Sequence, residues 1–239
     1  MKIFLTGGSG LLGKELIKSL KQEHDVCYPS STECDIKDKE KVNSYFERNK
    51  FDLCMHCAAF ISIAGCEKEI EKAIETNVVG TCNITQACIK SNTKLVYIST
   101  THVFDGSQGH YTITDAINPI GKYAKSKAAG ELVARMYENS LVIRTEFYGK
   151  EFPYEAAFTD RWASKDYIDI IAPKILMACL SAKKGIKHVG SKRRSLYEIA
   201  IQRKPEVKPI MTTEVKLNVP VLVDTSIKMD EENGRKTRK

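Results

Sequence analysis

Four glycines that directly follow a short apolar run are the feature that most constrains this chain. Residues 4–13 have the sequence FLTGGSGLLG. A glycine inside a helix costs about 1 kcal/mol relative to alanine, so these glycines serve something other than helix stability. The run fits G-x-G-x-x-G through Gly8, Gly10 and Gly13. It also fits G-x-x-G-x-x-G, in which Gly7 takes the first place.

The flanks of this run predict a strand, a tight turn and a helix. Residues 1–6 are apolar and favour a strand, whereas leucine and isoleucine recur at helical spacing from Leu11 to Leu20. Such a turn points backbone N–H groups and the positive end of the helix dipole at one spot, which favours a bound pyrophosphate. Gly13 also lets the helix pack closely on the strand. An ordinary glycine-rich turn is the alternative, and the strand–helix frame disfavours it.

Composition is typical of an enzyme that works in the cytoplasm. The 239 residues suit one or two domains, and no apolar run reaches the length that spans a membrane. A strand that starts at Met1 leaves no room for a signal peptide, and eight scattered cysteines suit reduced thiols. The formal charge of +7 comes partly from the tail GRKTRK. Since no nucleic-acid-binding motif accompanies it, we expect neither a nucleic-acid nor a membrane partner.

Predicted strands alternate with predicted helices along the chain. The strands are 1–6, 26–28, 51–60, 94–100 and 140–145, and the main helices are 11–20, 37–49, 67–91, 121–137, 167–183 and 195–202. This alternation implies an α/β fold, a Rossmann-type doubly wound parallel sheet. We expect residues 1–145 and about 167–184 to form the NAD(P)-binding domain. A small C-terminal substrate lobe would then comprise about 146–166 and 185–232, followed by a basic tail, 233–239.

Tyr123 and Lys127 are the first candidates for catalysis. They lie four residues apart on a predicted helix and therefore share one face. The pKa of a tyrosine is near 10, and a nearby ammonium lowers it, so the pair can transfer a proton at a carbonyl or alcohol oxygen. Thr100 ends a predicted strand at the edge where parallel sheets bind ligands. A surface Tyr–Lys pair is the alternative, but the glycine turn and Thr100 together favour catalysis.

Longer motifs identify a resemblance. The segments CDI, ETNVVGT, VYISTTHVFDG, INPIGKYAKSKAAGE and LVIRT occur in this order. Over residues 1–149 the chain resembles an extended short-chain dehydrogenase/reductase, and within that group the dTDP-4-dehydrorhamnose reductase family. The resemblance implies NAD(P)H-dependent reduction of the C4 ketone of a 4-keto-6-deoxy sugar that is carried on a nucleotide. The nucleotide sugar is the partner that we expect.

The resemblance also implies roles for individual residues. Tyr123 would protonate the C4 oxygen, Lys127 would tune Tyr123 and hold the nicotinamide ribose, and Thr100 would orient the ketone. Asn77 would lie in the helix below the active site. The expected cofactor-binding residues are Gly7, Gly10, Leu11, Leu12, Gly13, Ser30, Ser31, Asp35, Ile36, Ala58, Ala59, Ser99, Tyr123 and Lys127. No metal site is expected.

The chain departs from the family pattern near the substrate. Thr101 and His102 replace an Asp and a Tyr, and Phe147 stands where an indole would stack on the sugar or base. We take these three as candidate substrate contacts, although His102 can equally be a packing residue at the strand end. Related epimerase–reductases carry a catalytic Cys at the position of Thr101, so its absence argues against epimerisation. The C-terminal lobe is several dozen residues shorter than is usual in the family.

The turn after the second strand favours NADPH over NADH. An Asp or Glu at that strand end selects NAD in Rossmann folds, but residues 29–32 are PSST and carry no carboxylate. Ser30 and Ser31 can donate to a 2′-phosphate, whereas Glu33 comes about two residues late. Because hydroxyls give less than an arginine, we expect a preference for NADPH of about tenfold, with NADH tolerated.

Two other motifs carry less weight. Cys54 and Cys57 form a C-x-x-C, but they lie in a predicted buried strand without a second pair, which disfavours a metal or redox role. The basic segment 191–195, SKRRS, can touch a diphosphate, although a solvated turn is the simpler interpretation.

Two other functions stay open. The beta subunit of methionine adenosyltransferase has a similar fingerprint, so a non-catalytic NADP-binding regulatory subunit is one alternative. A bifunctional 3,5-epimerase/4-reductase that acts on a UDP sugar is the other. The sequence names neither the nucleotide nor the oligomeric state, and a homodimer is one of the states that it allows.

Overall fold

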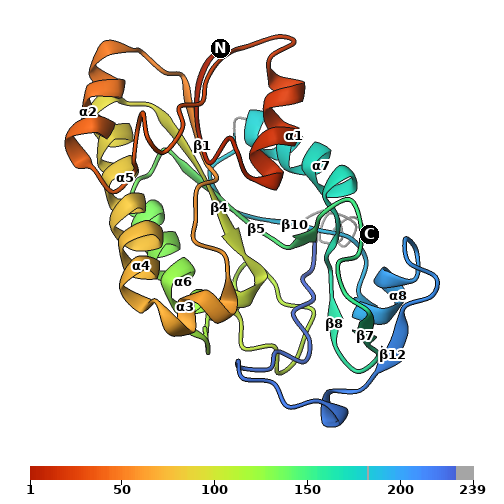
Figure 1. The fold of residues 1–239 in the computed structure, drawn as a ribbon. Coiled ribbons are helices and arrows are strands. Elements are labelled where there is room, and N and C mark those ends of the chain that lie inside the picture. Colours follow the sequence, from red (N-terminus) through yellow and green to blue (C-terminus); the bar gives the residue numbers. More distant parts are fainter. Residues whose placement is uncertain (182, 230–239) are drawn as a thin grey trace, which may run out of the picture.

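The centre of the molecule is a six-stranded sheet in which every neighbouring pair is parallel (Figure 1). The computed structural model describes residues 1–181 and 183–229, so the expected basic tail lies outside the described residues. The strand order is β10-β5-β4-β3-β1-β2. The strands are β1 (Lys2–Thr6), β2 (Asp25–Cys27), β3 (Leu53–His56), β4 (Lys94–Thr100), β5 (Ser140–Thr145) and β10 (Gly185–Val189).

Helices cover both faces of this sheet, which confirms the doubly wound fold (Figure 1). The helix pair α1 (Leu11–Leu20) and α7 (Ile168–Leu180) packs on one face. The other face carries α2 (Lys39–Arg48), α5 (Gly80–Ser91) and α6 (Lys122–Arg135). Successive residues of β1 point to opposite faces, so Ile3 and Leu5 join the first core and Phe4 joins the second.

The helix predicted over residues 67–91 is interrupted. It consists of α3 (Ile63–Lys68), α4 (Ile70–Ile74), one π-helical turn (Glu75–Val79) and α5. The first break falls at Glu69, whose φ of −116° and ψ of 63° are not helical. The π turn contains Asn77, whose side chain bonds groups outside its own helix. Such π turns are frequent at functional sites.

The C-terminal lobe is built from short strand pairs that join distant parts of the chain. These are β6 (Phe147–Tyr148) with β9 (Asp166–Tyr167), β7 (Ala156–Phe158) with β12 (Lys208–Ile210), and β8 (Trp162–Ala163) with β11 (Arg194–Ser195). A short helix, α8 (Leu196–Ala200), begins after Ser195, which forms a capping box with Glu198. This confirms the helix predicted over residues 195–202, which ends earlier than predicted.

The expected boundary of the lobe at residue 185 is wrong. Residues 185–189 form β10, which pairs in parallel with β5 at the edge of the central sheet. The physical reason is the crossover: α7 packs back on the sheet, so the strand that follows it lies beside β5.

The basic segment 191–195 is only partly the solvated turn that the sequence predicts, because Lys192 and Arg193 are exposed and Arg194 is not. Arg194 is buried, and its Nη2 lies 2.5 Å from Oδ2 of Asp166. The Nε of the exposed Arg193 lies 2.7 Å from Oδ2 of Asp224. Both guanidinium groups therefore pair with buried carboxylates of the chain, Arg194 from inside the lobe and Arg193 from its surface.

Residues 222–229, here called the C-terminal segment, tie the lobe to the loop after β4. The N–H of Thr225 donates to the carbonyl oxygen of Trp162 at 2.9 Å, and the N–H of Tyr111 donates to that of Ser226, also at 2.9 Å. Gly109 has a φ of +68°, and a Cβ there would lie 2.2 Å from Oδ2 of Asp224. The loop therefore needs glycine at this position to accept the segment.

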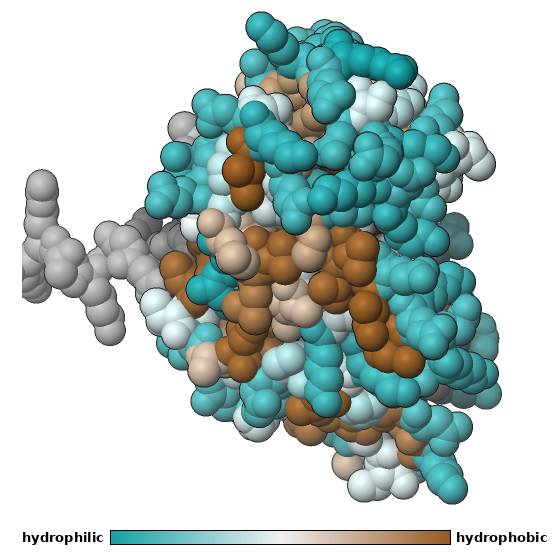
Figure 2. Space-filling model, turned by 90° about the vertical axis from the view of Figure 1, so that its left-hand side faces the viewer, coloured by the Kyte–Doolittle hydropathy of each residue, from teal (hydrophilic) through white to brown (hydrophobic). Residues whose placement is uncertain are grey.

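One face of the molecule gathers exposed hydrophobic side chains. Figure 2 shows them across the middle of the side that lies at the left of Figure 1, over the helices around α4 and α6. On these helices Leu132 is 51% exposed and Met136 is 82% exposed, and Ile74 and Val79 are also exposed. No helix of the described residues is long and apolar enough to cross a membrane.

Candidate active site

The glycine-rich turn between β1 and α1 has the geometry of a phosphate cradle. Gly7 has a φ of +72°, and its carbonyl oxygen accepts from the N–H of Gly10 at 3.0 Å. A Cβ on Gly13 would lie 2.2 Å from the carbonyl oxygen of Gly7, so only glycine lets the helix approach the turn. Gly10 is the N-cap of α1 and supplies no side-chain cap. The positive end of this helix therefore stays open to an anion.

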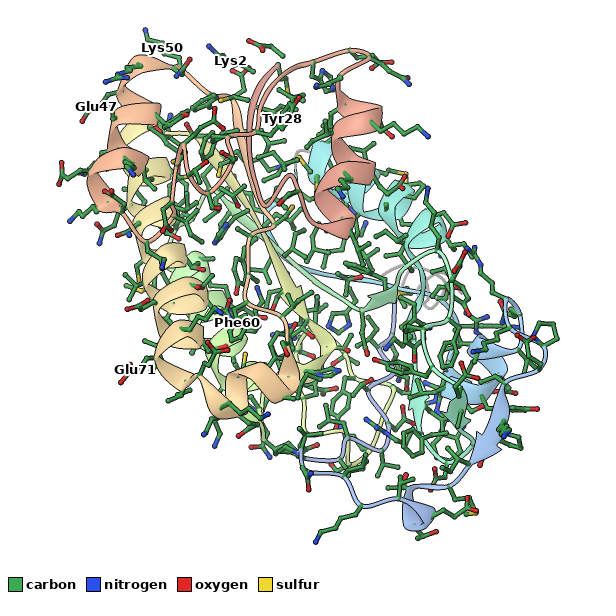
Figure 3. The ribbon with its side chains drawn as sticks, in the orientation of Figure 1. Lys2, Tyr28, Glu47, Lys50, Phe60 and Glu71 are labelled. Atoms are coloured by element: carbon green, nitrogen blue, oxygen red, sulfur yellow. The ribbon has the colours of Figure 1, made fainter. Side chains whose placement is uncertain are left out.

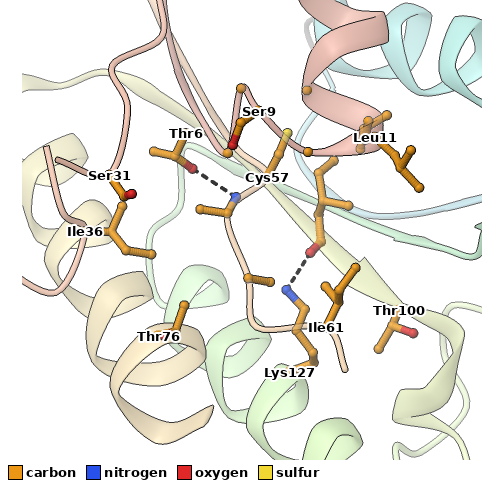
Figure 4. A pocket seen from close by; sticks show the side chains of 18 of the residues that line it. Thr6, Ser9, Leu11, Ser31, Ile36, Cys57, Ile61, Thr76, Thr100 and Lys127 are labelled. Carbon is orange, nitrogen blue, oxygen red and sulfur yellow. Dashed lines mark hydrogen bonds between the residues drawn. The ribbon is translucent and has the colours of Figure 1, made fainter. Parts of the chain in front are cut away.

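A cleft of about 1070 Å³ runs from this turn along the carboxyl ends of the strands to the C-terminal lobe (Figure 4). It starts beside β1, where the chain order of the strands reverses, as expected for a ligand site in such sheets. Every predicted cofactor or catalytic residue lines it. These are Gly7, Gly10, Leu11, Leu12, Gly13, Ser30, Ser31, Asp35, Ile36, Ala58, Ala59, Ser99, Thr100, Tyr123 and Lys127.

Thr100 and Tyr123 meet at the carboxyl end of β4. The hydroxyl of Thr100 lies beside the Tyr123 phenol and accepts from the N–H of His102 at 3.2 Å. Burial raises the pKa of Tyr123 to about 12, and the neighbouring Thr100 hydroxyl offsets this only in part. This is opposite to the lowering that the sequence predicts from Lys127. The phenol is therefore held protonated at neutral pH.

Lys127 lies one helical turn after Tyr123 on α6, and its side chain is buried. Its Nζ donates to the carbonyl oxygen of Ile98 at 2.8 Å and lies 4.2 Å from the centre of the Tyr97 ring (Figure 4). Burial lowers the pKa of Lys127 to about 7. Among the described residues, only Ile98 accepts a hydrogen bond from it, so two of its three donors are available to a ligand in the cleft.

Ser99 lines the cleft, but its hydroxyl points away from the cleft. The Oγ of Ser99 donates to Oε2 of Glu131 at 2.7 Å. Glu131 is fully buried and pairs with Arg144, whose Nη2 lies 2.6 Å from its Oε1. This ion pair anchors α6 to β4 and β5, directly behind the catalytic candidates.

Glu146, which sequence analysis missed, organises the substrate end of the cleft. It follows β5 and accepts from Oγ1 of Thr101 at 2.9 Å and from Nζ of Lys165 at 2.6 Å, while Nε2 of His102 lies 3.3 Å away. Burial alone would raise the pKa of Glu146, but the charges of Lys165 and His102 outweigh it and hold that pKa well below its usual range. Glu146 thus links the end of β4, the end of β5 and the lobe.

The three predicted substrate contacts separate in the structure. His102 and Phe147 line the cleft, and the His102 ring packs edge-on against Tyr123 with centroids 5.9 Å apart. Thr101 does not line it, because its side chain is buried and donates to Glu146. Lys165 lines the cleft as well, with its Nζ 3.9 Å from the centre of the Tyr148 ring. Because Glu146 directly follows a predicted strand, its place at the ligand-binding edge of the sheet could have been predicted. Nothing in the sequence indicated that Lys165 lines the cleft.

A buried hydrogen-bond chain connects the glycine turn to α6. His56 lies between two threonines, with Nδ1 2.7 Å from Oγ1 of Thr6 and Nε2 3.0 Å from Oγ1 of Thr81. Thr81 donates to the carbonyl oxygen of Asn77 at 2.7 Å. The amide of Asn77 then donates to Oγ of Ser126 at 2.9 Å. This series of hydrogen bonds holds the π turn against α6, the helix that carries Tyr123 and Lys127.

The turn after β2 differs from its sequence-based interpretation. Glu33, expected to come too late to matter, folds back so that Oε2 accepts from the hydroxyl of Ser30 at 2.7 Å. Glu33 lines the cleft together with Ser30 and Ser31. The turn therefore does carry a carboxylate, because one helical turn of backbone places the Glu33 side chain beside Ser30.

The cysteines form no disulfide in the described chain. All eight are free, and burial raises the pKa of Cys57 to about 12. Cys54 is fully buried in β3. Within residues 1–181 and 183–229 no three His, Cys, Asp or Glu side chains are grouped to hold a metal ion.

Comparison with known proteins defines the family. The family described as "RmlD substrate binding domain" matches residues 1–173, which is more than half of the chain. The chain belongs to this family. It is 34% identical to dTDP-4-dehydrorhamnose reductase from Aggregatibacter actinomycetemcomitans over 63% of this chain and 54% of that protein. It is 30% identical to methionine adenosyltransferase 2 subunit beta from Danio rerio over 54% of this chain and 42% of that protein. The chain thus spans about half the length of these curated relatives.

The RmlD-type fold extends through the lobe. A solved structure of dTDP-4-dehydrorhamnose reductase from Bacillus anthracis, in complex with NADP, superposes with a TM-score of 0.88 at 25% identity. The match covers 98% of this chain and 92% of that chain. The family resemblance is therefore confirmed over the motif-bearing half, and the fold likeness reaches beyond it.

Proposed function

We propose that this RmlD-family chain catalyses the NAD(P)H-dependent reduction of the C4 ketone of a nucleotide-linked 4-keto-6-deoxy sugar. The observation that carries the proposal is the meeting of Thr100, Tyr123 and Lys127 in one cleft that starts at an open helix N-terminus. The family match and the likeness to a reductase solved with NADP support it.

The residues present fit a dinucleotide. A Cβ on Gly10 would meet only the carbonyl oxygen of Gly7, at 3.3 Å, so the space above the turn is open to a pyrophosphate. Ile36 and Asp35 would flank the adenine, and Ala58 and Ala59 would line the path to the nicotinamide. Lys127 would hold the nicotinamide ribose with its two available donors. NADPH is the cofactor that we propose, with NADH as a second.

Tyr123 acts as the general acid in this reaction. When bound, the reduced nicotinamide supplies a hydride to C4 of the sugar. The hydroxyl of Tyr123 donates its proton to the C4 oxygen as negative charge develops there. Its raised pKa keeps it protonated until that moment, and the neighbouring Thr100 hydroxyl favours the charged form in part. The ammonium of Lys127, one turn along the same helix, would favour the resulting phenolate.

The substrate end would recognise the sugar and its diphosphate. Phe147 and Tyr148 offer aromatic surface to a sugar or base, and Lys165 offers a cation. His102 faces the cleft beside Tyr123 and is held by Glu146. Thr101 is excluded from direct contact because it is buried.

A non-catalytic regulatory subunit is the second candidate function. The likeness to methionine adenosyltransferase 2 subunit beta favours it, and so does the partial coverage of the reductases. A screen of dTDP-, UDP- and GDP-linked 4-keto-6-deoxy sugars with NADPH and NADH separates the two. Sugar-dependent oxidation that Tyr123→Phe abolishes supports the reductase. Tight NADPH binding without turnover on any sugar supports the subunit.

The same screen tests the epimerase–reductase alternative. Run in D₂O, an epimerase would place deuterium at C3 and C5 of the sugar, whereas a simple reductase would not. We expect no deuterium there, because Thr101 has no acidic side chain and faces Glu146.

The assembly and the division into domains are further proposals. We propose that residues 1–145 with α7 and β10 bind the cofactor, and that the rest of the described chain binds the substrate. The exposed hydrophobic side chains around α4 and α6 support a homodimer through that face. Leu132→Glu should then give a monomer in light scattering. A cytoplasmic location stays a prediction.

A further inference from the structure

The turn after β2 holds its own carboxylate against the donors of a serine. Oε2 of Glu33 accepts from the backbone N–H of Ser30 at 2.8 Å and from its hydroxyl at 2.7 Å. In return, the N–H of Glu33 lies 3.4 Å from Oγ of Ser30, and Ser30 Oγ lies 2.8 Å from Oγ1 of Thr32. The hydroxyl of Ser30, which the sequence analysis assigned to a phosphate, is thus already bonded to a carboxylate, and so is the N–H of Ser30.

The position of this carboxylate in the cleft gives it a ligand to act on. Glu33, Ser30 and Ser31 line the same wall, at the end of the strand that neighbours β1. In Rossmann folds this strand end lies beside the adenosine ribose. Glu33 forms no ion pair with any described residue. The Nζ of Lys37, four residues along the sequence, lies 3.6 Å from Oδ2 of Asp35 and 3.8 Å from Oε2 of Glu75. The charge of Glu33 is therefore not neutralised locally.

We propose that Glu33 sets the preference between NADH and NADPH. The proposal rests on the cofactor part of the proposed function. A ribose 2′-hydroxyl is a donor, so it can bond to the Glu33 carboxylate without disturbing Ser30. A 2′-phosphate is an anion that needs donors, so it must displace Glu33 from Ser30 and is repelled by its charge. Glu33 therefore weakens NADPH binding relative to NADH, whichever of the two the chain prefers overall.

A purely structural role for Glu33 predicts a different result. The reciprocal bonds between Ser30 and Glu33 form a capping box on a single helical turn, and the N–H of Cys34 completes that turn at 2.9 Å from the carbonyl oxygen of Ser30. Glutamine keeps a capping box, because its amide oxygen accepts as the carboxylate does. Glu33→Gln thus removes the charge and keeps the turn.

The experiment compares coenzyme binding by the unmodified chain and Glu33→Gln. Binding of NADPH and of NADH is followed by coenzyme fluorescence, with 2′,5′-ADP and 5′-AMP as competitors. The matched control is Glu47→Gln, which removes one carboxylate from the outer side of α2, away from the cleft. Figure 3 shows Glu47 there and also Tyr28, which follows β2 and lines the cleft. We expect the ratio of the NADH Kd to the NADPH Kd to rise at least about tenfold in Glu33→Gln only. The competitor 2′,5′-ADP should gain affinity while 5′-AMP does not.

Two outcomes overturn the proposal, and they differ in what else they overturn. If both coenzymes bind and Glu33→Gln leaves their ratio unchanged, Glu33 only caps its turn and the proposed function still stands. If the unmodified chain binds neither coenzyme, the proposed function fails and takes this proposal with it. Circular dichroism on both variants confirms that the comparison is made on folded protein.

Discussion

The ammonium of Lys127 donates to the carbonyl oxygen of Ile98 at 2.8 Å, on the wall of the cleft, and the residue is only 4% exposed. Burial brings its pKa from the usual 10.5 to about 7. Near neutral pH the free chain therefore holds a mixture of ammonium and amine at this position. A ligand that bonds the ammonium will draw the group to its charged form.

Coenzyme binding should accordingly take up protons. At pH 8 most free chains carry Lys127 as the amine, and bonds to ribose hydroxyls and nearby phosphate charge raise its pKa. We expect an uptake of about 0.5–1 proton per NADPH bound at pH 8, falling toward zero at pH 6. Calorimetry in two buffers of different ionisation enthalpy measures it. Lys127→Met should show none, and equal uptake in that variant would contradict the assignment.

Loss of the Tyr123 hydroxyl should stop the chemistry without disturbing the fold. Tyr123→Phe removes the positioned acid, so we expect turnover to fall at least about a hundredfold. The phenyl ring still packs against His102, so the unfolding midpoint and the NADPH Kd should hardly change. Steady-state NADPH oxidation and thermal unfolding provide both measurements. Near-normal turnover would end the assignment of Tyr123.

The pair of Glu146 and Lys165 should stabilise the lobe through coupling. Their side chains are only 16% and 11% exposed, so removing either charge leaves the other buried without its partner. We expect Glu146→Gln and Lys165→Met each to cost about 2–3 kcal/mol, and the double variant much less than their sum. Urea unfolding gives the three values.

The control for this cycle is the pair of Glu155 and Lys204, in which the Glu155 side chain is 89% exposed. Water screens that pair, so its coupling should be much smaller than that of the Glu146 pair. Similar coupling in the two cycles would mean that burial does not decide the strength of the Glu146 pair.

His56 should make the fold sensitive to mild acid. Burial, helped by the charge of Lys127, lowers the pKa of His56 to about 3, against about 6.5 in an unfolded chain. Between these values the unfolded state binds a proton that the folded state does not. The free energy of unfolding should therefore fall as pH drops below 6.5, by up to about 1.4 kcal/mol per pH unit from this residue.

Urea unfolding at pH 7.5, 6 and 5 checks this slope. His56→Gln should flatten it, whereas the exposed His110 should leave it unchanged when replaced by Gln. A slope that survives in His56→Gln would assign the acid sensitivity to other groups.

Patterns set by the backbone could be predicted from the sequence. The apolar runs of β1, β3, β4 and β5 indicate burial on both faces, so the positions of these strands and their parallel direction could be predicted. The short helix at residues 195–202 was predicted as well, whereas its capping box between Ser195 and Glu198 was not.

Features that depend on distant partners could not be predicted. The π turn at Asn77 forms because its amide bonds Phe60 and Ser126, 17 and 49 residues away in sequence. Lys165 enters the cleft only because the lobe folds over the end of β5. The hydrogen bond between Ser30 and Glu33 is local, so the S-x-x-E spacing of a capping box could have predicted it. The sequence-based interpretation instead considered only residues 29–32 at the strand end.

The C-terminal segment has a consequence for how the molecule is made. Ser226 accepts from the N–H of His110 across 116 residues of sequence, so that contact must wait for nearly the whole chain. Closing such a long loop costs entropy before any contact repays it. On the ribosome, strands β1 to β5 and their helices can therefore assemble before the C-terminal segment is made. A nascent chain passes through a stage in which the glycine turn and the end of β4 are in place while Glu146 still lacks its hydrogen bond from Thr225.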